Sequence, residues 1–175
     1  PAVLALMSDG TTHQKEAAAS VLAHLAYSTD FYDAAIVSAD GIPLLLDLMC
    51  EGWSNDQKEF AVRKLSSLAN NNAANQEAIA DVGGILPLVD AVRDGDTEQK
   101  KFFAASTLAI LADGNAPNQD AIAAAGGIEV LVDLVRDGFT EVVVEGAVLA
   151  LAKLAAHNDR NKAIIVAVDG IQALV

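Results

Sequence analysis

The sequence is poor in aromatic residues, in basic residues and in cysteine. Aromatic residues make up only 5% of its 175 residues although 53% are hydrophobic, so a core must come mainly from Ala, Leu, Val and Ile. Ala and Leu have high helix propensity, and this composition therefore favours helices. The single cysteine, Cys50, excludes an internal disulfide and is compatible with a reducing compartment. The expected location is intracellular and cytoplasmic.

Basic side chains are outnumbered, with 11 Lys and Arg against 24 Asp and Glu and a net charge of −13 at pH 7. Nucleic-acid binding relies on neutralising phosphates, so we expect no nucleic-acid partner. Anionic membranes are disfavoured for the same reason, and the longest apolar run, Ala163 to Val168, is too short to cross a bilayer. The acidic balance fits a basic protein partner or, more simply, solubility.

Glycine recurs at a fixed interval. One series is spaced by 43 residues, and each member precedes an isoleucine: Gly41, Gly84, Gly127 and Gly170. A second series keeps the same interval: Gly52, Gly95 and Gly138. A period of this size is typical of a repeat array, which usually forms a surface that holds a partner.

Each unit is predicted to contain three helices. In the copy that begins at Asn75, this residue is predicted to cap a short first helix, as are Asn118 and Asn161 in the next copies. Gly83-Gly84 then breaks the chain before a second helix. That helix carries its apolar residues at helical spacing: Ile85, Leu88, Val89 and Val92.

The third helix is longer. We expect Asp96 or Thr97 to cap it, and Asp113-Gly114 to end it. Its apolar residues recur between copies, as stacked helices require, and are predicted to form the core. The aligned sets are Ala18, Ala61, Ala104 and Ala147; Leu22, Leu65, Leu108 and Leu151; Leu25, Leu68, Leu111 and Leu154; Ala26, Ala69, Ala112 and Ala155; and, in the first helix, Ile36, Ile79, Ile122 and Ile165.

A short helix, a glycine turn, a Gly-Ile-x-x-Leu-Val helix and a longer Ala/Leu helix together resemble the armadillo repeat, most clearly at 84–89 and 127–132. HEAT repeats, which usually have two helices and no such glycine turn, are the second choice. The resemblance covers the whole chain and implies an all-α, right-handed α-solenoid whose third helices line a concave, peptide-holding groove. The expected units are a partial repeat 1–30, repeats 31–73, 74–116 and 117–159, and a partial repeat 160–175.

The sequence departs from the family pattern at the groove. Peptide-binding members usually carry an Asn ladder on the third helix, and here those positions hold His24, Ser67, Ile110 and Lys153. The positions of a Trp ladder hold Ser20, Arg63, Ser106 and Leu149. We therefore do not expect nuclear-localisation signals to bind in the importin-alpha manner.

The groove positions that differ between copies predict a partner recognised through its side chains. Aromatic and Arg residues are enriched at binding hot spots, which draws attention to Phe60, Arg63 and Phe103. The alternative is that both Phe side chains tilt into the core between repeats. The partner is expected to be a protein or peptide, basic in character, whose binding weakens with salt. The candidate groove residues are His24, Phe60, Arg63, Ser67, Phe103, Ser106, Ile110, Leu149 and Lys153.

Catalytic chemistry is not expected. The histidines His13, His24 and His157 lie in separate copies and share no metal-ligand spacing with Cys50, so neither a metal nor a cofactor is predicted. Cys50 aligns with arginines in its sister copies and should be an exposed thiol without a neighbouring base. For His24 an ordinary solvated histidine is the alternative to a ligand contact. Trp53 and Phe139 come after loop glycines, where packing over the loop is preferred to a role as partner anchors.

The sequence therefore predicts a non-catalytic protein-interaction scaffold. The alternative is a structural or self-assembling segment of a longer solenoid with no separate ligand. Neither end has a polar capping repeat, so we expect a fragment of a longer chain, with apolar ends that invite end-to-end association. The apolar residues expected to be partly exposed there are Val3, Leu4, Leu6, Ile171 and Leu174.

Overall fold

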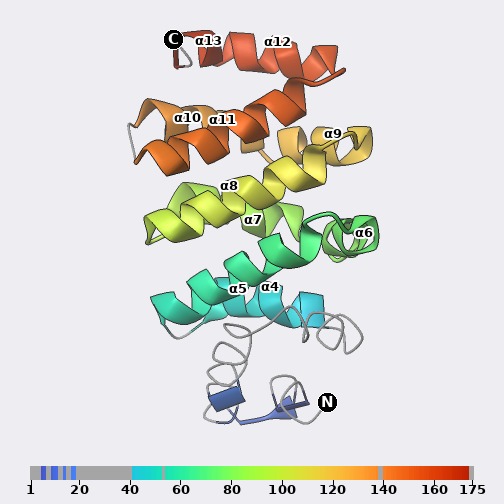
Figure 1. Cartoon of the computed structure of the whole chain (residues 1–175), viewed down its shortest axis with the longest axis vertical. Coiled ribbons are helices and arrows are strands. Elements are labelled where there is room, and N and C mark those ends of the chain that lie inside the picture. Colours follow the sequence, from blue (N-terminus) through green and yellow to red (C-terminus); the bar gives the residue numbers. More distant parts are fainter. Residues whose placement is uncertain are drawn as a thin grey trace.

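A computed structural model describes residues 5–6, 9–11, 14, 17–18, 41–52, 54–137 and 140–173. Throughout these residues the regular structure is helical, and the helices stack along one long axis (Figure 1). The first helices of the copies are α6 (Ala73–Asp81), α9 (Ala116–Ala124) and α12 (Asp159–Ala167). The second helices are α4 (Gly41–Glu51), α7 (Ile85–Asp94), α10 (Gly127–Arg136) and α13 (Gly170–Ala173). The third helices are α5 (Asn55–Ala69), α8 (Glu98–Ala112) and α11 (Glu141–Ala155).

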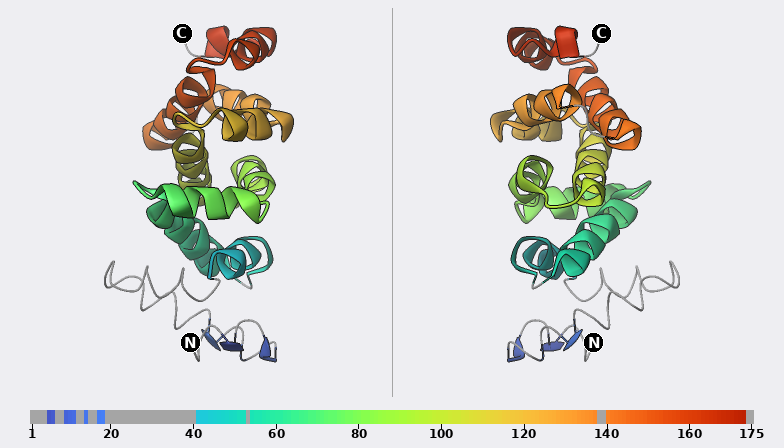
Figure 2. Two further views of the ribbon diagram at one scale, coloured as in Figure 1. Left: turned by 90° about the vertical axis from the view of Figure 1, so that its right-hand side faces the viewer. Right: turned by 90° about the vertical axis from the view of Figure 1, so that its left-hand side faces the viewer.

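The helix bounds repeat with the period of the glycines. Each third helix has 15 residues and each first helix from α6 onward has 9. Viewed from the side, the third helices form one wall of the stack and the second helices form the other (Figure 2). The predicted all-α solenoid of three-helix units is therefore confirmed.

The first helices begin earlier than the sequence suggested. The cap of α6 is Asn72, whose side chain accepts a hydrogen bond from the backbone N–H of Asn75, and Asn115 and Asn158 cap α9 and α12 in the same way. The prediction that Asn75 is the cap is wrong. Its amide instead donates to the carbonyl of Leu68 at 2.7 Å, at the end of the preceding third helix. Because Asn75 lies in the first turn of α6, it joins two helices that meet at a corner.

The turn between first and second helices needs two special residues. Gly83 and Gly126 have φ of 79° and 77°, in the left-handed region that favours glycine, and Asp169 takes the same position with φ of 57°. The next residue needs glycine because of a close approach. A Cβ atom on Gly127 would lie 2.6 Å from Cγ2 of Ile122 and 2.8 Å from its carbonyl oxygen. The 43-residue glycine series therefore marks the point where each second helix starts against the isoleucine of its own first helix.

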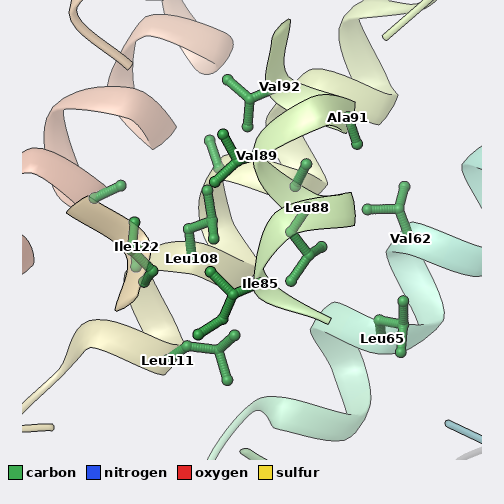
Figure 3. Close-up of a cluster of buried hydrophobic side chains, with 14 of the residues drawn as sticks. Val62, Leu65, Ile85, Leu88, Val89, Ala91, Val92, Leu108, Leu111 and Ile122 are labelled. Carbon is green, nitrogen blue, oxygen red and sulfur yellow. The ribbon is translucent and has the colours of Figure 1, made fainter. Parts of the chain in front are cut away.

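The core runs continuously between the walls. Leu108 and Leu111 of α8 lie beside Ile85 and Leu88 of α7 and Ile122 of α9, all of them buried (Figure 3). The repeated residues of the third helices that the structure describes are buried as predicted, except that Ala155 is half-buried. The members at 22, 25, 26 and 36 lie outside the described residues.

Thr97 caps α8 by accepting from the N–H of Lys100 at 3.1 Å, which decides between the two caps considered. Its hydroxyl also donates to the Glu59 carboxylate of α5 at 3.4 Å, and Thr140 donates to Glu98 of α8 at 2.9 Å. The third helices α8 and α11 are thus each tied at their start to the preceding one. This fixes the spacing of the wall that carries the candidate site.

Candidate functional site

The candidate site lies on the outer side of the third helices. We define the third-helix face as the accessible positions that recur every three or four residues along this side. On α5 it consists of Asp56, Arg63, Ser67 and Asn70; on α8 of Gln99, Phe103, Ser106, Ile110 and Asp113; and on α11 of Val142, Leu149, Lys153 and Ala156. Arg63, Phe103, Ser106, Ile110 and Lys153 are half-buried and the others are exposed.

The two aromatic candidates differ in accessibility. Phe60 is only 3% exposed and belongs to the hydrophobic core, so the structure agrees with the alternative in which this ring turns inward. Phe103 is half-buried and packs against the same core, with its edge toward Phe102 and a distance of 5.1 Å between the ring centroids. Phe103 therefore offers part of its surface to a partner, whereas Phe60 offers almost none.

Gly146 takes the place on α11 that Phe60 and Phe103 hold on the other helices. A Cβ atom there would meet the ring of Phe102 at 3.2 Å and the hydroxyl of Ser106 at 3.6 Å. The ring of Phe102 from α8 thus packs over the glycine. As a result α8 and α11 lie closely together, and Ser106 sits at their junction.

The far end of the face is held by polar contacts. Lys153 of α11 donates to the carboxylate of Asp113 at 2.9 Å, across the end of α8. Below it, the buried amide of Gln119 donates to the carbonyls of Ala112, Lys153 and Ala156 at 3.2, 2.9 and 3.2 Å. Lys153 is therefore neutralised within the protein, and its helix end is fixed relative to that of α8.

On α11 the face is apolar. Val142 is 53% exposed and Leu149 is 49% exposed. They are seven residues apart, two helical turns, so they share one side of the helix. At the aligned positions α8 carries Gln99 and Ser106, and α5 carries Asp56 and Arg63. The face therefore changes from charged on α5 to aliphatic on α11.

Other candidates from the sequence show no built site. Cys50 is an exposed free thiol, as predicted, and burial together with the neighbouring Glu51 carboxylate raises its pKa, which keeps it protonated. His157 is exposed at a turn with φ of 56°. The predictions for His13, His24, Trp53 and Phe139 concern residues outside those described.

Leu6 and Ile171 are exposed, as predicted, whereas the predicted exposure of Val3, Leu4 and Leu174 concerns residues that the structure does not describe. Within the described part of the chain, no group of three or more His, Cys, Asp or Glu side chains could hold a metal ion. None of the helices in that part is long and apolar enough to cross a membrane.

Three residues with a place in the site were missed by sequence reasoning. Val142 continues the row of Leu149 by two helical turns, and extending that row would have found it. Glu145 lies between them on the same side of α11 and is exposed. Gln119 gave a weaker signal: it aligns with Gln76, whose amide also donates to the carbonyl at the end of the preceding third helix, here Ala69 at 2.9 Å.

Comparison with solved structures supports the fold. An engineered protein superposes with a TM-score of 0.80 at 29% identity, over 99% of this chain and 69% of its own. Computationally designed armadillo repeat proteins for modular peptide recognition give a TM-score of 0.84 at 24% identity, over 98% and 71%. A designed armadillo repeat protein in complex with the peptide (KR)4 gives 0.80 at 24% identity, over 98% and 71%. A scan of protein-family models and a search of curated proteins gave no match.

Proposed function

We propose that this chain, which has the armadillo-repeat fold, is a non-catalytic scaffold that binds an extended segment of a basic protein or peptide on the third-helix face. The free thiol of Cys50 fits a reducing, intracellular and cytoplasmic setting for this role. The observation that carries the proposal is the contrast between the core and the face. The leucines beneath the third helices are identical from copy to copy, whereas the face positions above them all differ.

That contrast is clearest where the helices align. Leu65, Leu108 and Leu151 are buried and unchanged, because packing between copies fixes them. The neighbouring face position holds Arg63, Ser106 or Leu149. A surface that packing does not constrain, and that varies on a regular backbone, is suited to reading a sequence of side chains. The structural neighbour bound to (KR)4 has the same fold, and the net charge of −13 favours a basic ligand here too.

The length of ligand can be derived from the helix spacing. Adjacent packed helices lie about 8–10 Å apart and an extended chain advances about 3.3 Å per residue, so the three third helices span about six residues. A random peptide library of about twice that length, roughly 12 residues, can therefore cover the face in any register. We expect it to yield binders of micromolar affinity whose binding weakens with added salt, measured by fluorescence anisotropy.

The binding face can be mapped with a bulky maleimide label. Cys50 lies on α4, a second helix, and the label at this native thiol is the control. In a Cys50→Ser background, Ser67→Cys or Gln99→Cys places the same label on the third-helix face. We expect a label at either face position to abolish peptide binding and a label at Cys50 to leave it intact. Retained affinity with both face positions labelled, or the absence of any binder in the library, overturns the proposal.

Self-association is a second candidate, which one observation favours. Val148 of α11 is 37% exposed, whereas the aligned Val62 and Ala105 are fully buried. This side of α11, continued by the exposed Ile171 of α13, could bind a second copy. Sedimentation velocity over a range of concentrations tests it. Association that Val148→Asp abolishes supports this function, and a monomer at all concentrations excludes it.

A further inference from the structure

We propose that Val142, Glu145 and Leu149 of α11 form an anchor subsite for one large aliphatic side chain that is flanked in the partner by a Lys or Arg. The inference rests on the proposed peptide-binding function and specifies which part of the ligand carries recognition. The three residues occupy the third-helix face at steps of three and four, so they share one side of α11.

The exposure of the two aliphatic residues is not required by the solenoid. The aligned positions on α5 and α8 are filled by polar residues, and those helices pack equally well into the same wall. Nor does this exposure depend on the elements beyond α11 in the stack. Gln99 on α8 is exposed at the position of Val142 even though α11 packs beside α8. Val142 and Leu149 are therefore aliphatic at positions that face outward in every described copy.

The charges beside the two aliphatic residues determine the kind of ligand. Glu141 and Glu145 are exposed, and neither carboxylate forms a hydrogen bond or ion pair with another residue that the structure describes. The nearby cation of α11, Lys153, is held by Asp113 and is therefore balanced. The subsite combines accessible aliphatic surface with uncompensated negative charge. The complementary group is an aliphatic side chain next to a cationic one.

The position of Gly146 strengthens the subsite. On α5 and α8 the aligned residue is a phenylalanine, and here the ring of Phe102 from the neighbouring helix packs over the glycine instead. This contact fixes α11 against α8 immediately beside Leu149. A pre-positioned aliphatic surface binds a ligand at lower entropic cost than a mobile one.

Three defined peptide libraries test the ligand chemistry. Each has randomised flanks around a fixed core: Lys-Leu-Lys, Glu-Leu-Glu or Lys-Ser-Lys. We expect the chain to retain the Lys-Leu-Lys library at least tenfold better than either of the others. Equal retention of Glu-Leu-Glu refutes the charge part of the inference, and equal retention of Lys-Ser-Lys refutes the aliphatic anchor.

A matched pair of variants tests the location. Val142→Ser with Leu149→Ser removes the anchor, and Val166→Ser with Leu86→Ser removes a valine and a leucine of similar exposure, 56% and 54%, from a first and a second helix. We expect the first pair to weaken binding of a Lys-Leu-Lys peptide about tenfold, equivalent to about 1.4 kcal/mol, and the second pair to leave it unchanged. Glu145→Gln should weaken binding and reduce its dependence on salt.

The outcomes separate this inference from the proposed function. If no library is retained, the peptide-binding function itself fails. If peptides bind and the label at Ser67→Cys or Gln99→Cys blocks them, but the Val142 and Leu149 pair has no effect, the function stands and the anchor is refuted. Circular dichroism of both variant pairs confirms that each is folded before binding is compared.

Discussion

Substitution of Gly127 by alanine tests the physical reason for the glycine period. The added Cβ would lie 2.6 Å from Cγ2 of Ile122, 2.8 Å from its carbonyl oxygen and 3.3 Å from Cγ2 of Val89. Carbon atoms in contact prefer about 3.5–4.0 Å, so the overlap with Ile122 is close to 1 Å. Both neighbouring side chains are fully buried and have no free space to enter. The first helix must therefore move away from the second.

Overpacking of this kind costs about 1–3 kcal/mol, and the involvement of a backbone oxygen places this site near the upper end. Alanine gains back about 0.5–1 kcal/mol of helix propensity over glycine. We therefore expect Gly127→Ala to lower the free energy of unfolding by about 2 kcal/mol, measured by urea unfolding with circular dichroism. Gly126→Ala is a comparison without overlap, since its Cβ would find its nearest neighbour, Nη2 of Arg93, at 3.8 Å and its cost comes from φ alone.

A double-mutant cycle isolates the contact. Ile122→Ala removes Cγ2 and should cost about 2–5 kcal/mol in the native background. In the Gly127→Ala background it should cost about 1 kcal/mol less, because one of the two overlaps is relieved, whereas no coupling is expected with Gly126→Ala. An equal cost of Ile122→Ala in all three backgrounds would refute the steric explanation of the period.

Three further predictions concern single residues. Asn118→Ala should cost about 2–3 kcal/mol because it leaves a buried carbonyl without its donor, whereas Asn115→Ala removes a helix cap and should cost about 1 kcal/mol; equal losses in urea titrations contradict the two roles. Asp169→Gly should raise stability by about 0.5–1 kcal/mol, since φ is 57° there, and a lower Tm in calorimetry counts against this. The raised pKa of Cys50 should shift its alkylation by iodoacetamide to higher pH than for free cysteine, and coincident pH–rate profiles would disprove it.

The fold could be predicted from the sequence because packing between identical copies forces identical residues. Leu108 and Ile122 recur at 43 residues for the same reason that they are buried, so periodicity and burial carry the same information. The caps were misplaced because two asparagine series share that period. Asn72 and Asn75 are three residues apart, the spacing at which a cap side chain meets a backbone N–H, and this spacing was the usable signal.

The site was less accessible to sequence reasoning. Phe60 and Phe103 occupy aligned positions, yet their exposure differs, because a side chain's exposure depends on the residues that the neighbouring helix presents. The interchange of Phe102 and Gly146 across two helices likewise has no counterpart within one helix. Alignment of copies identifies which positions face outward, but it does not determine how far a ring turns toward its neighbour.

The amide of Gln119 has a mechanical consequence. By donating to carbonyls of both α8 and α11 it clamps the ends of two successive third helices, whereas among the described residues the amide of Gln76 donates only to Ala69 of α5. The packing of α8 with α11 is also more extensive than that of α5 with α8. In an array whose units touch only their neighbours, bending concentrates at the joint with the fewest constraints. The solenoid therefore behaves as a stiff block from α8 to α11 with a softer joint before it, which lets the wall adjust its curvature at α5 without disturbing α11.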